Sequence, residues 1–250
     1  SPQHGLSIEA LDLAFQTHGN IRAVVVVPNF QNPLGCVMPD AQKARLVALC
    51  ERQQVPLIED DTYGALTDDD TPLAAAKSWD ATGNVIYCSS MHKTLAPGMR
   101  LGWLLGGRWK ARIAMLKFAQ SRPNEPLAQI AVAEFMESRA YDRHLSRLRR
   151  ELKRQRDLTA EAIAAHFPSG TRLSVPQGGM LLWVEMPQQV SGTDVFEAAL
   201  RQGIRVAPGA MFSNGARYNH FLRISCGQRI TPDISRALLT LARIVDERTG

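Results

Sequence analysis

Three short apolar segments in the first part of the chain, at 23–27, 55–58 and 85–88, each lead directly into polar or turn-forming residues. The first segment, AVVVV, is mostly β-branched, which is typical of a parallel strand that is covered on both faces. A helical pattern at 40–54 separates the first two segments and is long enough to form a crossover between parallel strands. The sequence therefore predicts an α/β fold with a mostly parallel sheet and helices on both faces.

The pattern changes beyond a long amphipathic stretch at 141–166, which we predict to be a helix. Two short strand patterns follow at 172–175 and 180–185, with glycine-containing turn residues between them. We therefore expect a larger domain at 1–150 and a smaller α+β domain at 151–250. The remaining predicted elements are helices at 7–17, 109–120, 126–138, 193–202 and 232–247 and strands at 100–105, 204–207 and 221–225.

Composition excludes several classes of protein. Of the 250 residues, 45% are hydrophobic and 21% are charged, which is typical of a globular protein and not of a disordered one. No apolar run approaches the roughly 18 residues that cross a bilayer, so we expect no membrane contact. The four cysteines form no CxxC pair and the six histidines no HExxH spacing. We therefore expect reduced thiols, a cytoplasmic protein and no bound metal.

The net charge of +5 comes largely from the basic stretch RHLSRLRRELKRQR at 143–156. Leu145, Leu148 and Leu152 recur there at helical spacing, so the arginines occupy the opposite, solvent-exposed face of the helix. A nucleic-acid-binding patch is the less favoured alternative, because the chain has no helix-turn-helix or zinc-finger pattern. We therefore expect no DNA contact by this chain alone.

Lys93 follows the third apolar segment, within the stretch SSMHKTLAPGMR at 89–100. A single lysine is most often a surface charge, but burial or a neighbouring cation lowers the pKa of its amine and makes it a nucleophile. The hydroxyl of Ser90 and the guanidinium of Arg100 are suited to binding a phosphate group. This combination suits a phosphorylated aldehyde cofactor, pyridoxal 5′-phosphate (PLP), held on the lysine as a Schiff base.

Other polar residues follow the ends of the first two predicted strands, and parallel strand ends meet at one edge of a sheet. PLP needs a carboxylate at its pyridine nitrogen, because the protonated ring is the electron sink, and Asp60 is the candidate. Asn32 and Tyr63 can hydrogen-bond the phenolic oxygen of the cofactor. Taken singly, these residues are more often a helix cap, a turn residue and a tyrosine at the edge of a core.

Five ordered motifs together resemble the class I/II aminotransferases of PLP fold type I. They are PNFQNPLG (28–35), EDDTYG (59–64), SSMHKTLAPGMRLGW (89–103), QGGMLLWVEMP (177–187) and FLRISCG (221–227). The stretch FMESRAYDRHLSRLRREL (135–152) is most similar to the aminotransferase-like half of GntR/MocR-type transcription regulators. The resemblance implies PLP as the cofactor, an amino acid or 2-oxo acid as the ligand, and a homodimer.

The resemblance also implies roles for individual residues in the first predicted domain. Lys93 matches the Schiff-base lysine, which carries the proton to and from the α-carbon of the substrate. Asp60 matches the partner of the pyridine nitrogen, and Asn32 and Tyr63 match the donors to the ring oxygen.

Ser90 and Arg100 match ligands of the cofactor phosphate. Arg223, with Asn32, matches the substrate-binding residues, and the arginine grips the α-carboxylate of an amino acid. Its plain alternative is an exposed arginine at a strand edge. His92 stands where the family more often has serine or threonine, and a phosphate contact is its candidate role.

Proteins of this family normally begin with a further segment that holds a glycine-rich phosphate loop and an aromatic residue stacked on the pyridine. We therefore expect these 250 residues to be the C-terminal part of a longer polypeptide. Two functions stay open at this point. One is a ligand-sensing regulator domain, with DNA contact only through a missing N-terminal domain. The other is a free-standing PLP-dependent aminotransferase acting on an amino acid and a 2-oxo acid.

Overall fold

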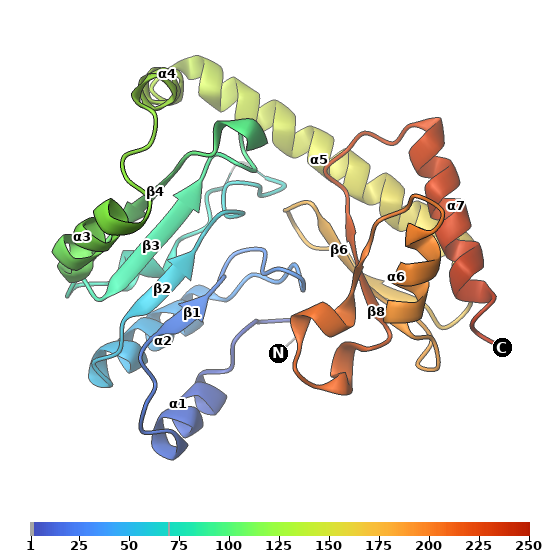
Figure 1. Ribbon diagram of the computed structural model, residues 1–250, viewed down its shortest axis with the longest axis horizontal. Coiled ribbons are helices and arrows are strands. Elements are labelled where there is room, and N and C mark those ends of the chain that lie inside the picture. Colours follow the sequence, from blue (N-terminus) through green and yellow to red (C-terminus); the bar gives the residue numbers. More distant parts are fainter. Residues whose placement is uncertain (1–2, 70) are drawn as a thin grey trace. The chain divides into compact units, whose positions relative to one another are not determined.

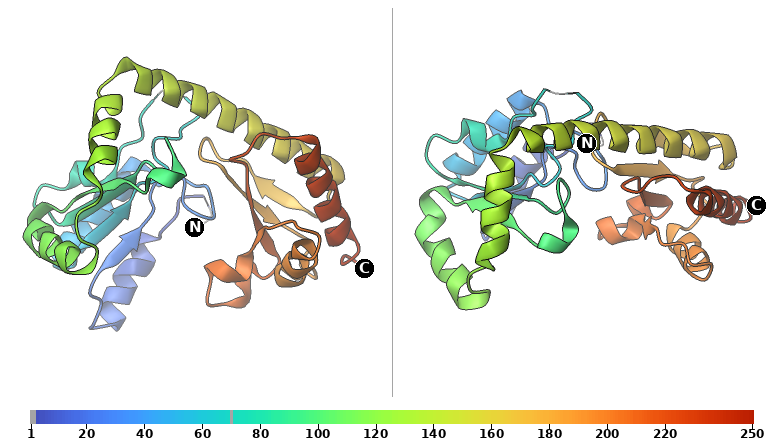
Figure 2. Two further views of the ribbon diagram at one scale, coloured as in Figure 1. Left: turned by 45° about the horizontal axis from the view of Figure 1, so that its top comes forward. Right: turned by 90° about the horizontal axis from the view of Figure 1, so that it is seen from above.

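The computed structural model describes residues 3–69 and 71–250, which form two compact units. The first unit contains the chain up to Gln31 together with Cys36–Leu148, and the second contains Asn32–Gly35 together with Arg149–Gly250. Helix α5 belongs to both units and runs unbroken through the division (Figures 1 and 2). The predicted boundary between residues 150 and 151, which gives two contiguous domains, stays a prediction. It differs from the two units in one further respect, because it leaves Asn32–Gly35 in the first domain.

Four strands form the sheet of the first unit (Figure 1). They are β1 (Val24–Val26), β2 (Leu57–Asp60), β3 (Val85–Ser90) and β4 (Gly102–Leu105), and they lie in that order. β1, β2 and β3 are parallel, and β4 returns antiparallel to β3. The predicted α/β class with a mostly parallel sheet is thereby confirmed.

The helices of the first unit agree closely with the helical patterns in the sequence. They are α1 (Ile8–Thr17), α2 (Asp40–Arg52), α3 (Lys110–Gln120), α4 (Pro126–Met136) and the first part of α5 (Arg139–His166). α1 and α2 pack on β1 and β2 around a buried core that includes Ile8, Val24, Val26, Leu46, Leu49, Leu57 and Val85. None of the described helices is long and apolar enough to cross a membrane.

The AVVVV run predicts that β1 is covered on both faces, and for the described residues this prediction is wrong. Val24 and Val26 are buried, but Val25 between them is 67% exposed. On β4, Leu104 and Leu105 are also exposed. A run of β-branched residues indicates strand propensity. Such a run contains no information about which element covers each face of the strand, because this covering depends on segments that are distant in the chain.

The second unit contains a smaller, antiparallel sheet. Its strands are β5 (Arg172–Ser174), β6 (Leu181–Glu185), β7 (Ala207–Pro208) and β8 (Phe221–Ser225), in the order β5-β6-β8-β7. The strand predicted at 204–207 is thus two residues long and lies at Ala207–Pro208.

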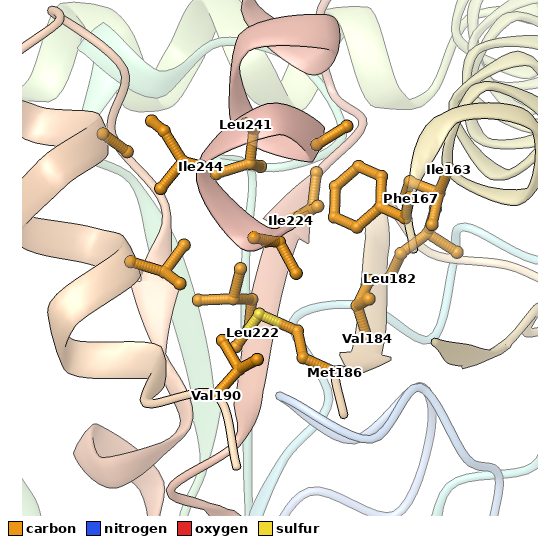
Figure 3. Close-up of a cluster of buried hydrophobic side chains, with 14 of the residues drawn as sticks. Ile163, Phe167, Leu182, Val184, Met186, Val190, Leu222, Ile224, Leu241 and Ile244 are labelled. Carbon is orange, nitrogen blue, oxygen red and sulfur yellow. The ribbon is translucent and has the colours of Figure 1, made fainter. Parts of the chain in front are cut away.

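Two helices, α6 (Gly192–Leu200) and α7 (Pro232–Asp246), pack with the second half of α5 on the core of the second unit. Figure 3 shows the side chains of this core, which α5, β6, β8 and α7 all contribute. β6 and β8 present alternate residues to this core, so Leu222 and Ile224 of β8 point into it.

Candidate functional site

β2 ends in three consecutive acids, Glu59, Asp60 and Asp61, which the alternation of strand side chains directs to opposite faces. Glu59 is fully buried and shares its face of the sheet with Leu57, a core residue. Asp61 is 9% exposed and continues on that face. Asp60 is half-buried and points to the other face. Of the three carboxylates, only that of Asp60 is therefore directed away from the α2 side of the sheet.

The carboxylate of Asp60 is held by the residue two positions further along the chain. Its Oδ1 atom accepts hydrogen bonds from the backbone nitrogen of Thr62 at 3.1 Å and from the Thr62 hydroxyl at 2.5 Å. Among the described residues, none donates a hydrogen bond to Oδ2. One oxygen thus orients the carboxylate, and the other is left for a ligand.

Lys93 lies close to the loop that follows Asp60. Its Nζ atom is 5.9 Å from the centroid of the Tyr63 ring, and Tyr63 follows Asp60 by three residues. The Lys93 side chain is half-buried, and its amine makes no hydrogen bond or ion pair with the described residues. The backbone nitrogen of Asp61 donates to the carbonyl oxygen of Cys88 at 2.8 Å, which joins the ends of β2 and β3. Asp60, Tyr63 and Lys93 are therefore brought together at one end of the sheet.

The candidate phosphate ligands occupy the turn after β3. Ser90 is the last residue of β3, pairs with Gly102 of β4 and is half-buried. Arg100 is exposed and takes a left-handed backbone conformation with φ of 52°. The Nδ1 atom of His92 is buried and has no hydrogen-bond partner among the described residues. A buried polar atom without a partner costs free energy, so this nitrogen is a place where a ligand could supply the missing hydrogen bond.

In the second unit, Arg223 of β8 donates a hydrogen bond from Nη1 to Oδ1 of Asn32 at 2.9 Å. The guanidinium also lies over the Phe212 ring, 5.1 Å from its centroid. Arg223 is half-buried on an inner strand of the sheet, so the alternative of an exposed arginine at a strand edge is wrong. Its Nε atom is buried without a hydrogen-bond partner in the described part of the chain. The guanidinium is therefore oriented and still has an unused donor.

A buried lysine near the three acids was not singled out in the sequence. Lys43 of α2 is 0% exposed, and its Nζ atom donates to Oδ1 of Asp40 at 3.2 Å and to the carbonyl oxygen of Ala74 at 2.7 Å. A signal was available, because Lys43 lies three and four residues before Leu46 and Val47, on the apolar face of the helix. Sequence reasoning places lysines at the surface by default, since fully buried lysines are rare.

The two buried acids beside Asp60 have partners of their own. Glu59 accepts hydrogen bonds from the backbone nitrogens of Ala76 at 2.6 Å and Lys77 at 2.8 Å. Burial raises the pKa of the Glu59 carboxyl.

Asp61 accepts hydrogen bonds from Nδ2 of Asn29 at 2.9 Å and from the hydroxyl of Tyr87 at 3.0 Å. Burial raises the pKa of the Asp61 carboxyl, and burial together with the Asp61 charge raises the pKa of Tyr87. These contacts fix the backbone on both sides of Asp60, so they determine the direction of its side chain. The sequence singled out Asp60 and its neighbours in the chain but not Asn29 or Tyr87.

The chain matches the protein-family model described as aminotransferase class I and II over residues 1–239. It is 37% identical over 244 residues to the HTH-type transcriptional regulator YjiR of Escherichia coli, covering 98% of this chain and 52% of that protein. It is 33% identical over 246 residues to the regulator YdcR of the same organism, with coverage of 98% and 52%. The chain thus spans about half the length of the curated relatives it matches.

Among solved structures, the kynurenine aminotransferase of Pyrococcus horikoshii, crystallised in complex with PMP, matches with a TM-score of 0.89. That match has 26% sequence identity and covers 99% of this chain and 63% of the other. The family model and this likeness extend over the sheet of the first unit and the sheet of the second. The strand ends that carry Asp60 and Lys93 and the strand that carries Arg223 thus lie within one matched region. The chain therefore belongs to the class I and II aminotransferase family.

Proposed function

We propose that this chain binds PLP and forms the C-terminal, effector- and cofactor-sensing half of a GntR/MocR-type transcription regulator. The observation that carries the proposal is the pattern of coverage: 98% of the chain matches each of two regulators, but only 52% of each regulator is covered. DNA contact then belongs to the other half of the regulator.

The residues at the end of the first sheet fit the polar groups of PLP. When bound, PLP supplies an electron sink for the bonds at the α-carbon of an amino acid. The unused Oδ2 atom of Asp60 is suited to a protonated pyridine nitrogen, and the Tyr63 hydroxyl is suited to the ring oxygen. The Lys93 amine, half-buried and without an ion pair among the described residues, is the candidate nucleophile. The presence of PMP in the Pyrococcus relative supports this assignment.

The turn after β3 is the proposed phosphate site. The Ser90 hydroxyl and the exposed Arg100 guanidinium supply donors that match phosphate oxygens. The buried Nδ1 atom of His92 has no hydrogen-bond partner among the described residues, and an N–H at this position would supply a further donor to the phosphate.

In the second unit, we assign Arg223 and Asn32 to binding the α-carboxylate of an amino acid or a 2-oxo acid. The hydrogen bond to Asn32 and the Phe212 ring hold the guanidinium in one orientation. A guanidinium that is already oriented loses little conformational entropy when it binds a carboxylate with two hydrogen bonds. The buried Nε atom without a partner is the second donor that such a pair requires.

A free-standing PLP-dependent aminotransferase is the second candidate, favoured by the position of the Lys93 amine near Tyr63. In that function, the Lys93 amine would act as the general base that takes the proton from the α-carbon of the bound amino acid and, once protonated, as the general acid that gives it back. Homodimer formation belongs to both candidates and is part of the proposal.

The test uses the full-length protein titrated with PLP and followed by visible absorbance. We expect wild type to acquire the absorbance band of lysine-bound cofactor, and Lys93→Ala to lack it. Lys110→Ala is the matched control, because the Lys110 side chain is exposed and makes no hydrogen bond or ion pair with the described residues. A band that persists in Lys93→Ala would remove the lysine assignment.

Amino acids added to the PLP-loaded protein separate the two candidates. A sensing domain changes its spectrum and its DNA affinity without accumulating a 2-oxo acid, whereas an aminotransferase accumulates that product over many turnovers. Arg223→Lys keeps the charge but loses the two-pronged geometry, so it should weaken the amino-acid response far more than PLP binding.

A further inference from the structure

The second unit contains a cavity on the face of its sheet opposite to Arg223. The cavity has a volume of about 410 Å³, and Ile224, Ser225 and Cys226, at the end of β8 and just beyond it, line it. Because strand side chains alternate, Ile224 and Cys226 point away from the face that carries Arg223. In Figure 3, Ile224 faces the core that α7 covers. The cavity is therefore separate from the proposed carboxylate site.

Most of the residues that line the cavity are apolar, and they come from elements far apart in the sequence. One wall is the segment before β7, with Ile204 and Val206, and the facing wall is α7, with Leu238 and Leu241. Leu241 and Leu238 are 1% and 8% exposed, so this wall is part of the packed core and not a loose surface. A volume of about 410 Å³ lies within the range of sites that bind small molecules.

The polar side chains of the cavity carry positive but no negative charge. Arg205 lines the cavity, is exposed and forms no ion pair with the described residues. No acidic side chain lines the cavity among the described residues. Thr159, whose hydroxyl donates to the carbonyl oxygen of Gln155 at 2.7 Å, and Gln228 add polar atoms. A cavity that combines apolar side chains with polar atoms and a single unpaired cation is complementary to an amphipathic molecule that carries one anionic group.

We propose that this cavity is an effector site for a small amphipathic anion, whose apolar body lies between α7 and Ile204–Val206 and whose anionic group pairs with Arg205. The site is distinct from the PLP site and does not depend on it. Thr159 belongs to α5, the helix that continues into the first unit. A molecule in this cavity therefore contacts an element that both units share, which suits a sensing function.

The test is isothermal titration of the full-length protein with two probes of equal chain length and opposite charge, octanoate and octylammonium. We expect octanoate to bind to wild type and octylammonium not to bind. Arg205→Ala should weaken octanoate binding about tenfold or more, because a charge-assisted contact is lost. Arg201→Ala is the matched control, because Arg201 is also exposed and does not line the cavity; it should leave the affinity unchanged.

A second variant tests the volume and not the charge. Ala237 lines the cavity on α7, so Ala237→Trp should fill it and abolish octanoate binding. Ala216→Trp, outside the cavity, is its control, and circular dichroism of both variants checks that the fold is kept. The proposal is overturned if wild type does not bind octanoate, if octylammonium binds equally well, or if neither Arg205→Ala nor Ala237→Trp weakens binding.

Discussion

The two units differ in how much of their apolar surface they cover with their own residues. In the second unit, Leu181–Val184 of β6 are all buried. In the first unit, Val25 is 67% exposed, Phe118 of α3 is 61% exposed and Leu127 of α4 is 73% exposed. Extended exposed apolar surface is typical of a region that contacts other protein. The second unit also exposes single apolar side chains, such as Met211 at 71%, but the exposed apolar residues are more numerous in the first unit. The first unit therefore presents more surface suited to further protein contacts, such as the proposed homodimer.

The largest expected effect comes from removing core volume in the second unit. Leu222→Ala empties a position that is 0% exposed, and we expect it to lower the free energy of unfolding by about 2–5 kcal/mol. Val25→Ala, on the open face of β1, should lower it by less than about 1 kcal/mol. Urea unfolding followed by circular dichroism measures both. Equal costs for the two variants would show that β1 is covered and would break the comparison.

The next largest effect is a difference in stability cost between substitutions at the two buried acids of the first unit, Glu59 and Asp61. Both oxygens of Glu59 accept backbone hydrogen bonds, from Ala76 and Lys77. Glu59→Gln turns an amide NH₂ toward one of these N–H groups, so we expect a loss of about 1–3 kcal/mol. Asp61→Asn should cost less, because an amide can still accept from Asn29 and donate to the Tyr87 oxygen. Urea unfolding of both variants tests the order, and a larger cost for Asp61→Asn would contradict it.

Two serine N-caps, one in each unit, test whether the burial of apolar surface in a unit affects the hydrogen bonds at its helix ends. Ser7 caps α1 in the first unit and Ser191 caps α6 in the second, and each hydroxyl accepts a backbone hydrogen bond at 3.2 Å. Because capping is local, Ser7→Ala and Ser191→Ala should each cost about 1 kcal/mol. Hydrogen exchange of the amides in the first turn of each helix measures the loss. A loss of stability in only one of the two helices would show that the contribution of the cap depends on the residues around the helix.

The smallest effect is a pH dependence located at Asp61. Burial raises its pKa in the folded state above the unfolded value of about 4. The folded state therefore binds the proton of the Asp61 carboxyl more tightly than the unfolded state does. The contribution of this proton to stability declines as pH rises from about 4 through the folded pKa. Relative to wild type, Asp61→Asn should be more stable at pH 8 than at pH 4. Urea unfolding at pH 4 and at pH 8 measures the difference in stability between Asp61→Asn and wild type. A difference that is the same at both pH values would refute a raised pKa of Asp61.

Local patterns were sufficient to predict most elements of both units. The helical spacing of apolar residues predicted α1, α2 and α5 to within a few residues, because helix formation depends on neighbours three and four positions away. The turn residues after each strand indicated Asp60, Tyr63 and Lys93, because the end of a strand is also a local property. The open face beside Val25 and the burial of Lys43 were not predicted, because burial depends on distant segments.

The order of residues along this chain by itself determined the strands, the helices and the strand ends at which reactive side chains occur. Only the tertiary structure decided which side chains meet. Asn32 and Arg223 are 191 residues apart, yet they form one hydrogen bond. Strand alternation alone could not show that Glu59 and Asp61 have buried partners while Asp60 keeps an oxygen free. The physical reason is that hydrogen bonding and burial are set by packing between elements, whereas helix and strand formation respond first to adjacent residues.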